Sequence, residues 1–209
     1  MKRRDETFVV GVVGNSGVGK TTLLEDLIPE LTGRGLAVAV VKHASHGFEV
    51  DRPGKDSQRL YASGPVAVAL ASDTQVATFV RPERDSRVSL AGAMAGLPSG
   101  LDVVLVEGFA WEPIPRFVLV SPGQTPRREH RESGPALRIL EVPEPLAGRK
   151  PVYARDLVRG IALEIVHRIR PRVVPDADVR TLPSCRSRAV RDHREEDSSW
   201  KLVSAQEPI

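Results

Sequence analysis

The sequence predicts a three-layer α/β fold with a mostly parallel sheet and an inserted β-hairpin. Residues 8–13 and 101–109 are apolar runs rich in valine, which is typical of strands buried on both faces. A helical pattern over 21–31 follows the first run, and alternation of strands with helices is typical of a parallel sheet. Two further apolar runs, 66–71 and 75–80, are separated by only three residues, which indicates a hairpin.

The other elements follow from the same patterns in chain order. Residues 36–41 form an apolar run after the helix, and they complete a β-α-β unit with a right-handed crossover. Leucine, isoleucine and valine recur at helical spacing over 157–169, which predicts a final amphipathic helix. The remaining predicted elements are helices at 55–62 and 89–97 and strands at 116–121, 136–142 and 151–154.

Composition restricts the class of protein. The chain has 209 residues and a net charge of +3, and its charges are mixed in sign along the sequence. Nucleic-acid-binding proteins usually concentrate basic residues in one run or on one face, so we expect no nucleic-acid partner. The N-terminal apolar run is short and is broken by Gly11 and Gly14, so we expect neither a signal peptide nor a membrane span. Cys185 is the only cysteine, which favours a reducing compartment, and a cytoplasmic location is expected.

Periodicity ends near residue 170 and divides the chain into two parts. Residues 1–170 contain all the predicted elements and form one predicted domain. Residues 171–209 mix proline, arginine and acidic residues without a period, which predicts a disordered C-terminal tail.

The stretch GNSGVGKT, residues 14–21, lies between the first predicted strand and the first predicted helix. It matches the phosphate-binding pattern G-x-x-x-x-G-K-[ST] in the structural context that this pattern requires. Glycines let successive backbone N–H groups point at phosphate oxygens, and the helix N-terminus adds partial positive charge. The sequence therefore predicts a P-loop NTPase. The predicted nucleotide-binding residues are Gly14, Asn15, Ser16, Gly17, Val18, Gly19, Lys20, Thr21 and Thr22.

Two side chains are predicted to act in catalysis. Lys20 is expected to reach the β- and γ-phosphates of a bound nucleotide. Glu107 ends an apolar strand, as the acidic residue of a Walker B motif does. It is expected either to hold Mg²⁺ through water or to position the attacking water. The alternative for Glu107 is an acid that is merely solvated at a strand end.

Magnesium ligands are predicted from two segments. Thr21 and Glu107 are expected to bind the ion beside the phosphates. Asp51 is a third candidate; it precedes a Pro-Gly turn, so capping of that turn is the alternative. His43 and His46 are three residues apart, but a zinc site needs further ligands that the sequence does not offer, and contact with anions is favoured.

Four segments together resemble the molybdopterin-guanine dinucleotide biosynthesis protein B family. They are GNSGVGKTTL, VVKHASHGFEVDRPGKDSQR, ASGPVAVAL and VLVEGF, and they occur in the order typical of that family. The second segment is the most diagnostic, because P-loops occur in many unrelated proteins. The resemblance covers residues 8–170.

The resemblance implies that residues 1–170 form a P-loop domain that binds GTP with Mg²⁺ and hydrolyses GTP weakly at most. It implies an adaptor in molybdenum cofactor biosynthesis. The adaptor would assist a molybdenum cofactor guanylyltransferase that joins GMP to molybdopterin, which makes molybdopterin guanine dinucleotide. It also implies a homodimer with an extended sheet, in which the hairpin over 66–80 is a candidate interface.

Two positions depart from the family pattern. Ala110 stands where the family usually has a basic residue after the EGF motif, which puts binding of an anionic pterin or a partner at this position in doubt. Arg116 stands where lysine is common, and it is a candidate to compensate.

The residues themselves do not select the base. Residues 121–124 and Asp156 follow predicted strands and are candidates to read guanine, although an N-cap of the last helix explains Asp156 better. The choice of GTP therefore rests on the resemblance. One alternative function is a P-loop small-molecule kinase, whose lid would use Arg127, Arg128 and Arg131. A nucleotide-controlled metallochaperone is a further alternative.

Overall fold

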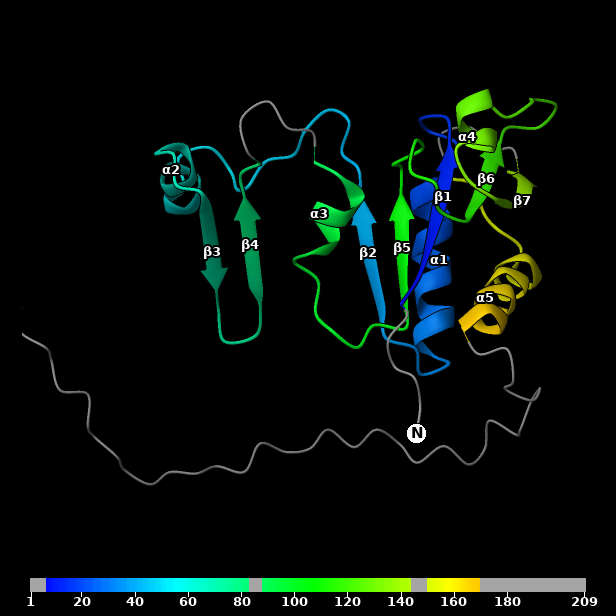
Figure 1. Ribbon diagram of the computed structural model, residues 1–209, viewed down its shortest axis with the longest axis horizontal. Helices are drawn as coiled ribbons and strands as arrows, with labels where there is room; N and C mark the ends of the chain where they lie inside the picture. The colour runs from blue at the N-terminus through cyan, green and yellow to red at the C-terminus, as the bar shows by residue number, and fades with distance from the viewer. Residues whose placement is uncertain (1–6, 83–87, 144–149, 170–209) are drawn as a thin grey trace, which may run out of the picture. The chain divides into compact units, whose positions relative to one another are not determined.

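A five-stranded parallel sheet forms the centre of the fold (Figure 1). The computed structural model describes residues 7–82, 88–143 and 150–169. The strand order is β2-β5-β1-β6-β7, and every neighbouring pair is parallel. The strands are β1 (Phe8–Gly14), β2 (Val38–Lys42), β5 (Val103–Glu107), β6 (Arg116–Val120) and β7 (Ala136–Glu141). Their carboxyl ends meet at one edge, where ligands of open α/β sheets bind.

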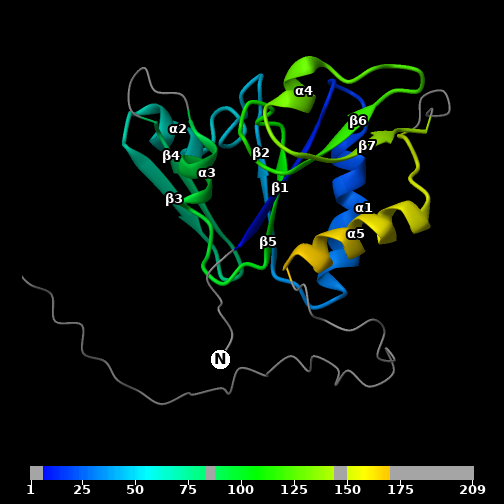
Figure 2. The same cartoon turned by 45° about the vertical axis from the view of Figure 1, so that its right-hand side comes forward.

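Helices cover both faces of this sheet, which gives three layers (Figure 2). On one face α1 and α5 pack against each other and share a buried cluster with Val103 and Leu105. On the other face α3 packs through Leu90 against Val104 and Val106. Successive side chains of β5 thus alternate between two cores, and the predicted three-layer α/β fold is confirmed. These helices are α1 (Lys20–Thr32), α3 (Leu90–Met94) and α5 (Arg155–Ile169).

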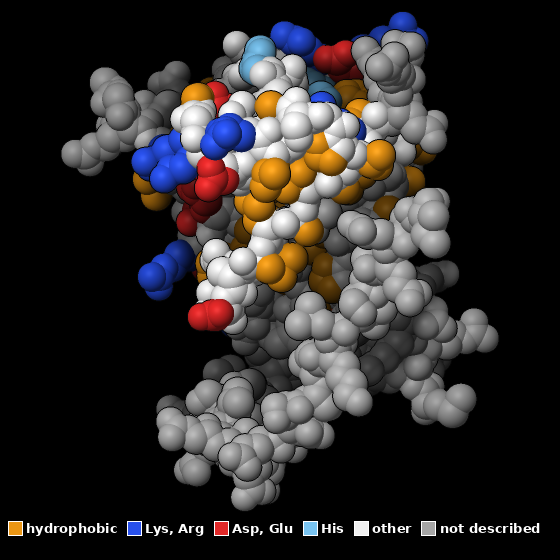
Figure 3. Space-filling view, turned by 90° about the vertical axis from the view of Figure 1, so that its left-hand side faces the viewer, with side chains coloured by type: hydrophobic (Ala, Val, Ile, Leu, Met, Phe, Trp, Pro, Cys, Tyr) orange, Lys and Arg blue, Asp and Glu red, His pale blue; other side chains and the backbone are white. Residues whose placement is uncertain are grey.

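The predicted hairpin is present as a separate antiparallel sheet of two strands, β3 (Ala67–Ala71) and β4 (Val76–Val80). The helix α2 (Asp56–Ala62) packs on it, since the rings of Tyr61 and Phe79 are 6.4 Å apart. No residue of either strand is buried. Seen from the side of α2 and β3, Figure 3 shows hydrophobic side chains gathered in a band. The most exposed valines of this region are Val66 (78% exposed), Val76 (74%) and Val80 (64%).

The structure differs from the predicted elements at two places. The predicted strand at 151–154 is wrong, because these residues pair with no strand and lead directly into α5. Pro151 has no N–H to donate to a ladder, and Tyr153 points inward to the P-loop instead. The second difference is α4 (Arg128–Glu132), a helix that the sequence did not predict. The predicted tail, 171–209, lies outside the described residues.

Within the described ranges, none of the helices is both long enough and apolar enough to cross a membrane.

Candidate functional site

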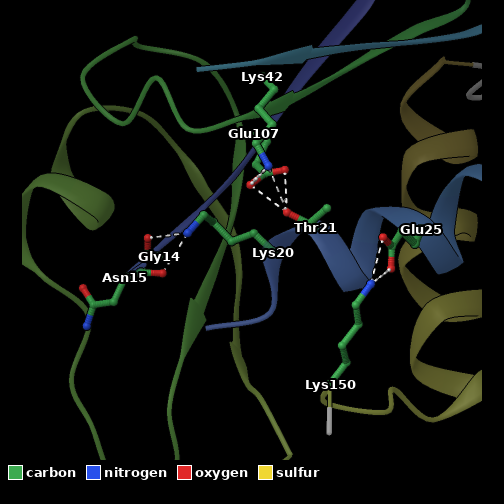
Figure 4. A network of polar contacts seen from close by, with 8 residues as sticks. All are labelled: Gly14, Asn15, Lys20, Thr21, Glu25, Lys42, Glu107 and Lys150. Carbon is green, nitrogen blue, oxygen red and sulfur yellow. Dashed lines mark hydrogen bonds and ion pairs between the residues drawn. The ribbon is translucent and has the colours of Figure 1, made fainter. Parts of the chain in front are cut away.

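The P-loop curls around the amine of Lys20 (Figure 4). Its first residue, Gly14, ends β1, and Lys20 begins α1. Lys20 Nζ donates hydrogen bonds to the carbonyl oxygens of Gly14 at 3.1 Å and Asn15 at 2.7 Å. Burial lowers the pKa of Lys20, and the nearby carboxylate of Glu107 acts in the opposite direction. The lysine is therefore held at the centre of the loop, where phosphate oxygens would take the place of the two carbonyls.

Gly14 is required by the neighbouring strand as well as by the loop. Its φ of 152° favours glycine, and a Cβ at this position would lie 2.5 Å from the carbonyl oxygen of Leu119 in β6. The backbone of β6 thus approaches the P-loop so closely that no side chain fits between them.

Thr21, Lys42 and Glu107 form a contact cluster next to the P-loop (Figure 4). Thr21 Oγ1 donates to the carboxylate of Glu107 and lies 3.0 Å from each of its oxygens. Lys42 Nζ lies 3.1 Å from Glu107 Oε1 and 3.2 Å from Thr21 Oγ1. Lys42 and Glu107 are partners in the parallel register of β2 and β5, so the sheet itself places the ion pair. The side chain of Glu107 is only 10% exposed.

The Thr21 hydroxyl and the Glu107 carboxylate fit a magnesium ion. Both are hard oxygen ligands, which Mg²⁺ prefers. Two oxygens bound to one Mg²⁺ at about 2.1 Å in neighbouring octahedral positions lie about 3.0 Å apart. The separation of 3.0 Å between Thr21 Oγ1 and Glu107 Oε1 matches this requirement without rearrangement. The contact supports the prediction that these two residues hold the ion.

A cavity of about 950 Å³ surrounds this cluster at the carboxyl ends of the strands. Its size is appropriate to a nucleotide-sized ligand. Seven of the nine predicted nucleotide-binding residues line it; Asn15 and Val18 do not. The segment after β2 lines it as well, as its position after a strand suggests. The lining includes residues 42–47, 107–108, 127, 129–130 and 150–151.

Asp51 does not line this cavity. Its carboxylate accepts hydrogen bonds from the backbone N–H of Arg52 at 2.7 Å and from the hydroxyl of Ser57. The hydrogen bond from Ser57, more than any other interaction, lowers the pKa of Asp51. These contacts are those of a turn-capping acid, and binding of Mg²⁺ by Asp51 stays a prediction.

Arg116 does not face the cavity as a replacement for a basic residue at position 110. It is fully buried, and its guanidinium donates to the carbonyl oxygens of Ala110 at 2.6 Å, Ile114 at 3.2 Å and Glu112. Burial lowers the pKa of Arg116. The arginine thus holds the segment that follows Glu107 in one conformation.

An aromatic cluster borders the cavity beside Glu107. The ring of His43 lies 5.1 Å from that of Phe109 and 4.9 Å from that of Trp111, in edge-to-face contacts. Phe109 has a φ of 49°, which is unusual for a bulky residue. A Cβ at Gly108 would lie 2.9 Å from Cβ of His43. His43 is therefore fixed by ring packing.

Within the described ranges no three His, Cys, Asp or Glu side chains are grouped so as to hold a metal ion.

The helix α4 contributes residues that sequence reasoning missed. His130 is buried, lines the cavity, and has a pKa lowered by burial. Of the predicted lid arginines, Arg127 lines the cavity, whereas Arg128 and Arg131 lie 2.6 and 3.7 Å from carboxylate oxygens of Glu132. No apolar period signals this helix, so only the run of arginines drew attention to it.

Tyr153 is a second missed residue. It is 5% exposed, and its hydroxyl donates to the carbonyl oxygen of Gly19 at 3.1 Å. Burial raises the pKa of Tyr153 to about 12.

The candidates for reading guanine do not line the cavity. Asp156 lies in the first turn of α5, and residues 121–124 form a turn in which the backbone N–H of Gln124 donates to the carbonyl oxygen of Ser121.

The family model for molybdopterin guanine dinucleotide synthesis protein B matches residues 9–139. The chain belongs to this family. The match includes the P-loop, Lys42 and Glu107, so the clustered residues of the site all lie within the family region.

Individual relatives agree with the family model. A molybdopterin-guanine dinucleotide biosynthesis adapter protein of Haemophilus influenzae is 46% identical over 112 residues, which are 53% of this chain and 62% of that protein. The protein of the same name from Escherichia coli is 39% identical over 115 residues, 54% of this chain and 66% of that protein. The matches thus span less than two thirds of either relative. A crystal structure of molybdopterin-guanine biosynthesis protein B has 32% identity and a TM-score of 0.59, and it covers 78% of this chain and 99% of its own.

Proposed function

We propose that this protein is a GTP-binding adaptor in molybdenum cofactor biosynthesis. In this role it assists a molybdenum cofactor guanylyltransferase in attaching GMP to molybdopterin, which yields molybdopterin guanine dinucleotide. The observation that carries the proposal is the 3.0 Å contact of Thr21 with Glu107 beside the P-loop, in a chain of the molybdopterin guanine dinucleotide synthesis protein B family. Relatives that are named adapter proteins of this pathway support it. The proposal includes a cytoplasmic location, which the single cysteine supports.

Each residue of the cluster has a role in this proposal. The P-loop backbone holds the phosphates, and Lys20 neutralises their charge. Thr21 and Glu107 would hold Mg²⁺, which would supply charge neutralisation at the phosphates. Glu107 is also the group that can orient water through its second oxygen. The resemblance to the family, rather than the geometry of the site, is the basis for expecting weak hydrolysis.

The proposal also includes a homodimer that is formed through the hairpin. Isolated two-stranded sheets are marginally stable in water, and one face of this one is exposed along its whole length and carries Val76 and Val80. A second copy of the chain supplies a matching set of open strand edges and valines. Joining two such hairpins would extend the sheet and cover residues such as Val66 and Val76.

Calorimetric titration with magnesium and either GTP or ATP tests the nucleotide assignment. We expect tight binding of GTP, weaker binding of ATP, and a loss of at least about a hundredfold in affinity for Lys20→Ala, because two charge-assisted hydrogen bonds disappear. Arg34→Ala is the matched control, since Arg34 follows α1, pairs with Glu30 at 2.6 Å and does not line the cavity. Equal affinity of wild type and Lys20→Ala would contradict the P-loop assignment. Preference for ATP would favour the kinase, and Arg127 would then be the next residue to substitute.

Reconstitution tests the adaptor role itself. Purified guanylyltransferase, molybdopterin, GTP and magnesium are combined with and without the full chain, and formation of the dinucleotide is followed. We expect the chain to raise the yield or the rate and Lys20→Ala to do so less. If the chain changes neither quantity although it binds GTP, the adaptor role is wrong and the nucleotide assignment still holds.

A further inference from the structure

The amine of Lys42 lies against the same two oxygens that fit magnesium. Its distances of 3.1 Å to Glu107 Oε1 and 3.2 Å to Thr21 Oγ1, with 3.0 Å between the oxygens, form a nearly equilateral triangle. Of the cationic side chains that the structure describes, Lys42 is the one within ion-pair distance of Glu107. Lys20 lies nearby, but its hydrogen bonds go to the P-loop carbonyls.

We propose that Lys42 is a built-in counter-ion of Glu107 with which a magnesium ion competes for the same two oxygens, so that this lysine sets how strongly nucleotide binding depends on the metal. The inference rests on the proposed function, and it adds a residue that controls affinity at the same site.

Geometry makes the two cations compete. A Mg²⁺ ion about 2.1 Å from both oxygens would lie between about 1.3 and 4.2 Å from Lys42 Nζ, depending on the side of the oxygen pair that it takes. The shorter distance is a steric clash, and the longer one places a divalent and a monovalent cation in direct repulsion. The lysine therefore has to leave its position if the metal takes the near side of the oxygen pair, and it opposes the metal electrostatically if the metal takes the far side.

Burial decides which member of the pair moves. The side chain of Glu107 is 10% exposed and ends a fully buried strand, so it stays in place. The side chain of Lys42 is 53% exposed and reaches solvent by rotation about its own bonds. Without a cation, Glu107 would carry an unpaired charge beside the phosphates of a nucleotide. Lys42 removes this repulsion in the metal-free protein, and magnesium removes it once bound.

The test compares the affinity for GTP in EDTA with that in magnesium, for the full chain and for Lys42→Met. We expect the gain in affinity from magnesium to be at least about tenfold larger in Lys42→Met than in wild type. Without its counter-ion Glu107 repels metal-free GTP, and the metal then has no amine to compete with. Lys42→Arg retains the charge and is expected to behave as wild type. Lys55→Met, which removes a charge outside the cavity, is the matched control.

Thermal melts with magnesium alone separate this inference from the proposed function. We expect the metal to raise the melting temperature of Lys42→Met more than that of wild type or Lys55→Met. If wild type binds no GTP, the proposed function fails and the melts alone decide the role of Lys42. If magnesium raises the affinity for GTP by the same factor in Lys42→Met and in wild type, the inference is overturned. If neither protein binds GTP, an equal shift of the two melting temperatures by magnesium would overturn it.

Discussion

The strand β5 and the β3–β4 hairpin consist of similar apolar residues in opposite environments. Every residue of β5 is buried, because strands flank it on both sides and helices cover both faces. In the hairpin no strand residue is buried, and the exposed fraction of Val76 is 74%. The same kind of sequence therefore stabilises the monomer in one region and leaves an exposed apolar surface in the other, where we propose that a second copy binds.

The largest loss of stability is expected when a side chain of β5 is shortened. Leu105→Ala removes a side chain that is 0% exposed and leaves a cavity, so we expect the free energy of unfolding to fall by about 2–5 kcal/mol. Val76→Ala, in the hairpin, is the paired variant and is expected to cost less than about 0.5 kcal/mol in dilute protein. Urea titration measures both. Similar losses of unfolding free energy in the two variants would show that the hairpin is packed as tightly as the central sheet. The contrast between β5 and the hairpin would then be wrong.

An intermediate loss of stability is expected when the phenol of Tyr153 ionises. This phenol donates a hydrogen bond to Gly19 of the P-loop. The folded state holds the phenol proton more tightly, since the pKa rises from 10.0 to about 12. The protonated phenol therefore contributes to the free energy of unfolding. This contribution is complete below about pH 10 and is lost as the pH rises through about 12, because the unfolded chain releases the proton first. The loss amounts to about 2–3 kcal/mol. We expect this part of the alkaline destabilisation to be absent in Tyr153→Phe, and urea titrations from pH 9 to 12 would measure it. An identical pH dependence in both proteins would place the phenol outside the core.

The smallest effect on unfolding, and the most specific one, is expected for polar substitutions on the hairpin. Val66→Thr and Val80→Thr should each change the free energy of unfolding of the monomer by less than about 0.5 kcal/mol. Combined, they should weaken self-association, which sedimentation velocity over a range of protein concentrations would detect. Unchanged association of the double variant would place the dimer interface elsewhere.

The sequence predicted the parallel sheet well, for a physical reason. Uninterrupted apolar runs such as the one that ends at Glu107 have few alternatives to a buried parallel strand. Parallel strands bring their carboxyl ends to one edge, so the approach of Thr21 to Glu107 followed from the order of the elements.

The parts that the sequence did not predict depend on contacts between distant residues. The helix α4 has no apolar period, and an ion pair of Arg128 with Glu132 and the buried side of His130 stabilise it. The role of Arg116 depends on three backbone carbonyls that only the folded loop brings together. Tyr153 lies in an apolar stretch typical of a strand, and its bond to Gly19 crosses 134 positions of the chain.

Gly14 has a consequence for how such proteins change over evolutionary time. The residue meets two independent demands, one from the phosphates and one from the carbonyl of Leu119. A descendant that no longer used nucleotide would be free to lose Lys20, but the sheet would still exclude every side chain at position 14. A lone glycine at the end of the first strand, without the lysine, would then be no evidence of an ancestral phosphate site. For the same reason, a defect caused by substituting Gly14 says nothing by itself about nucleotide binding.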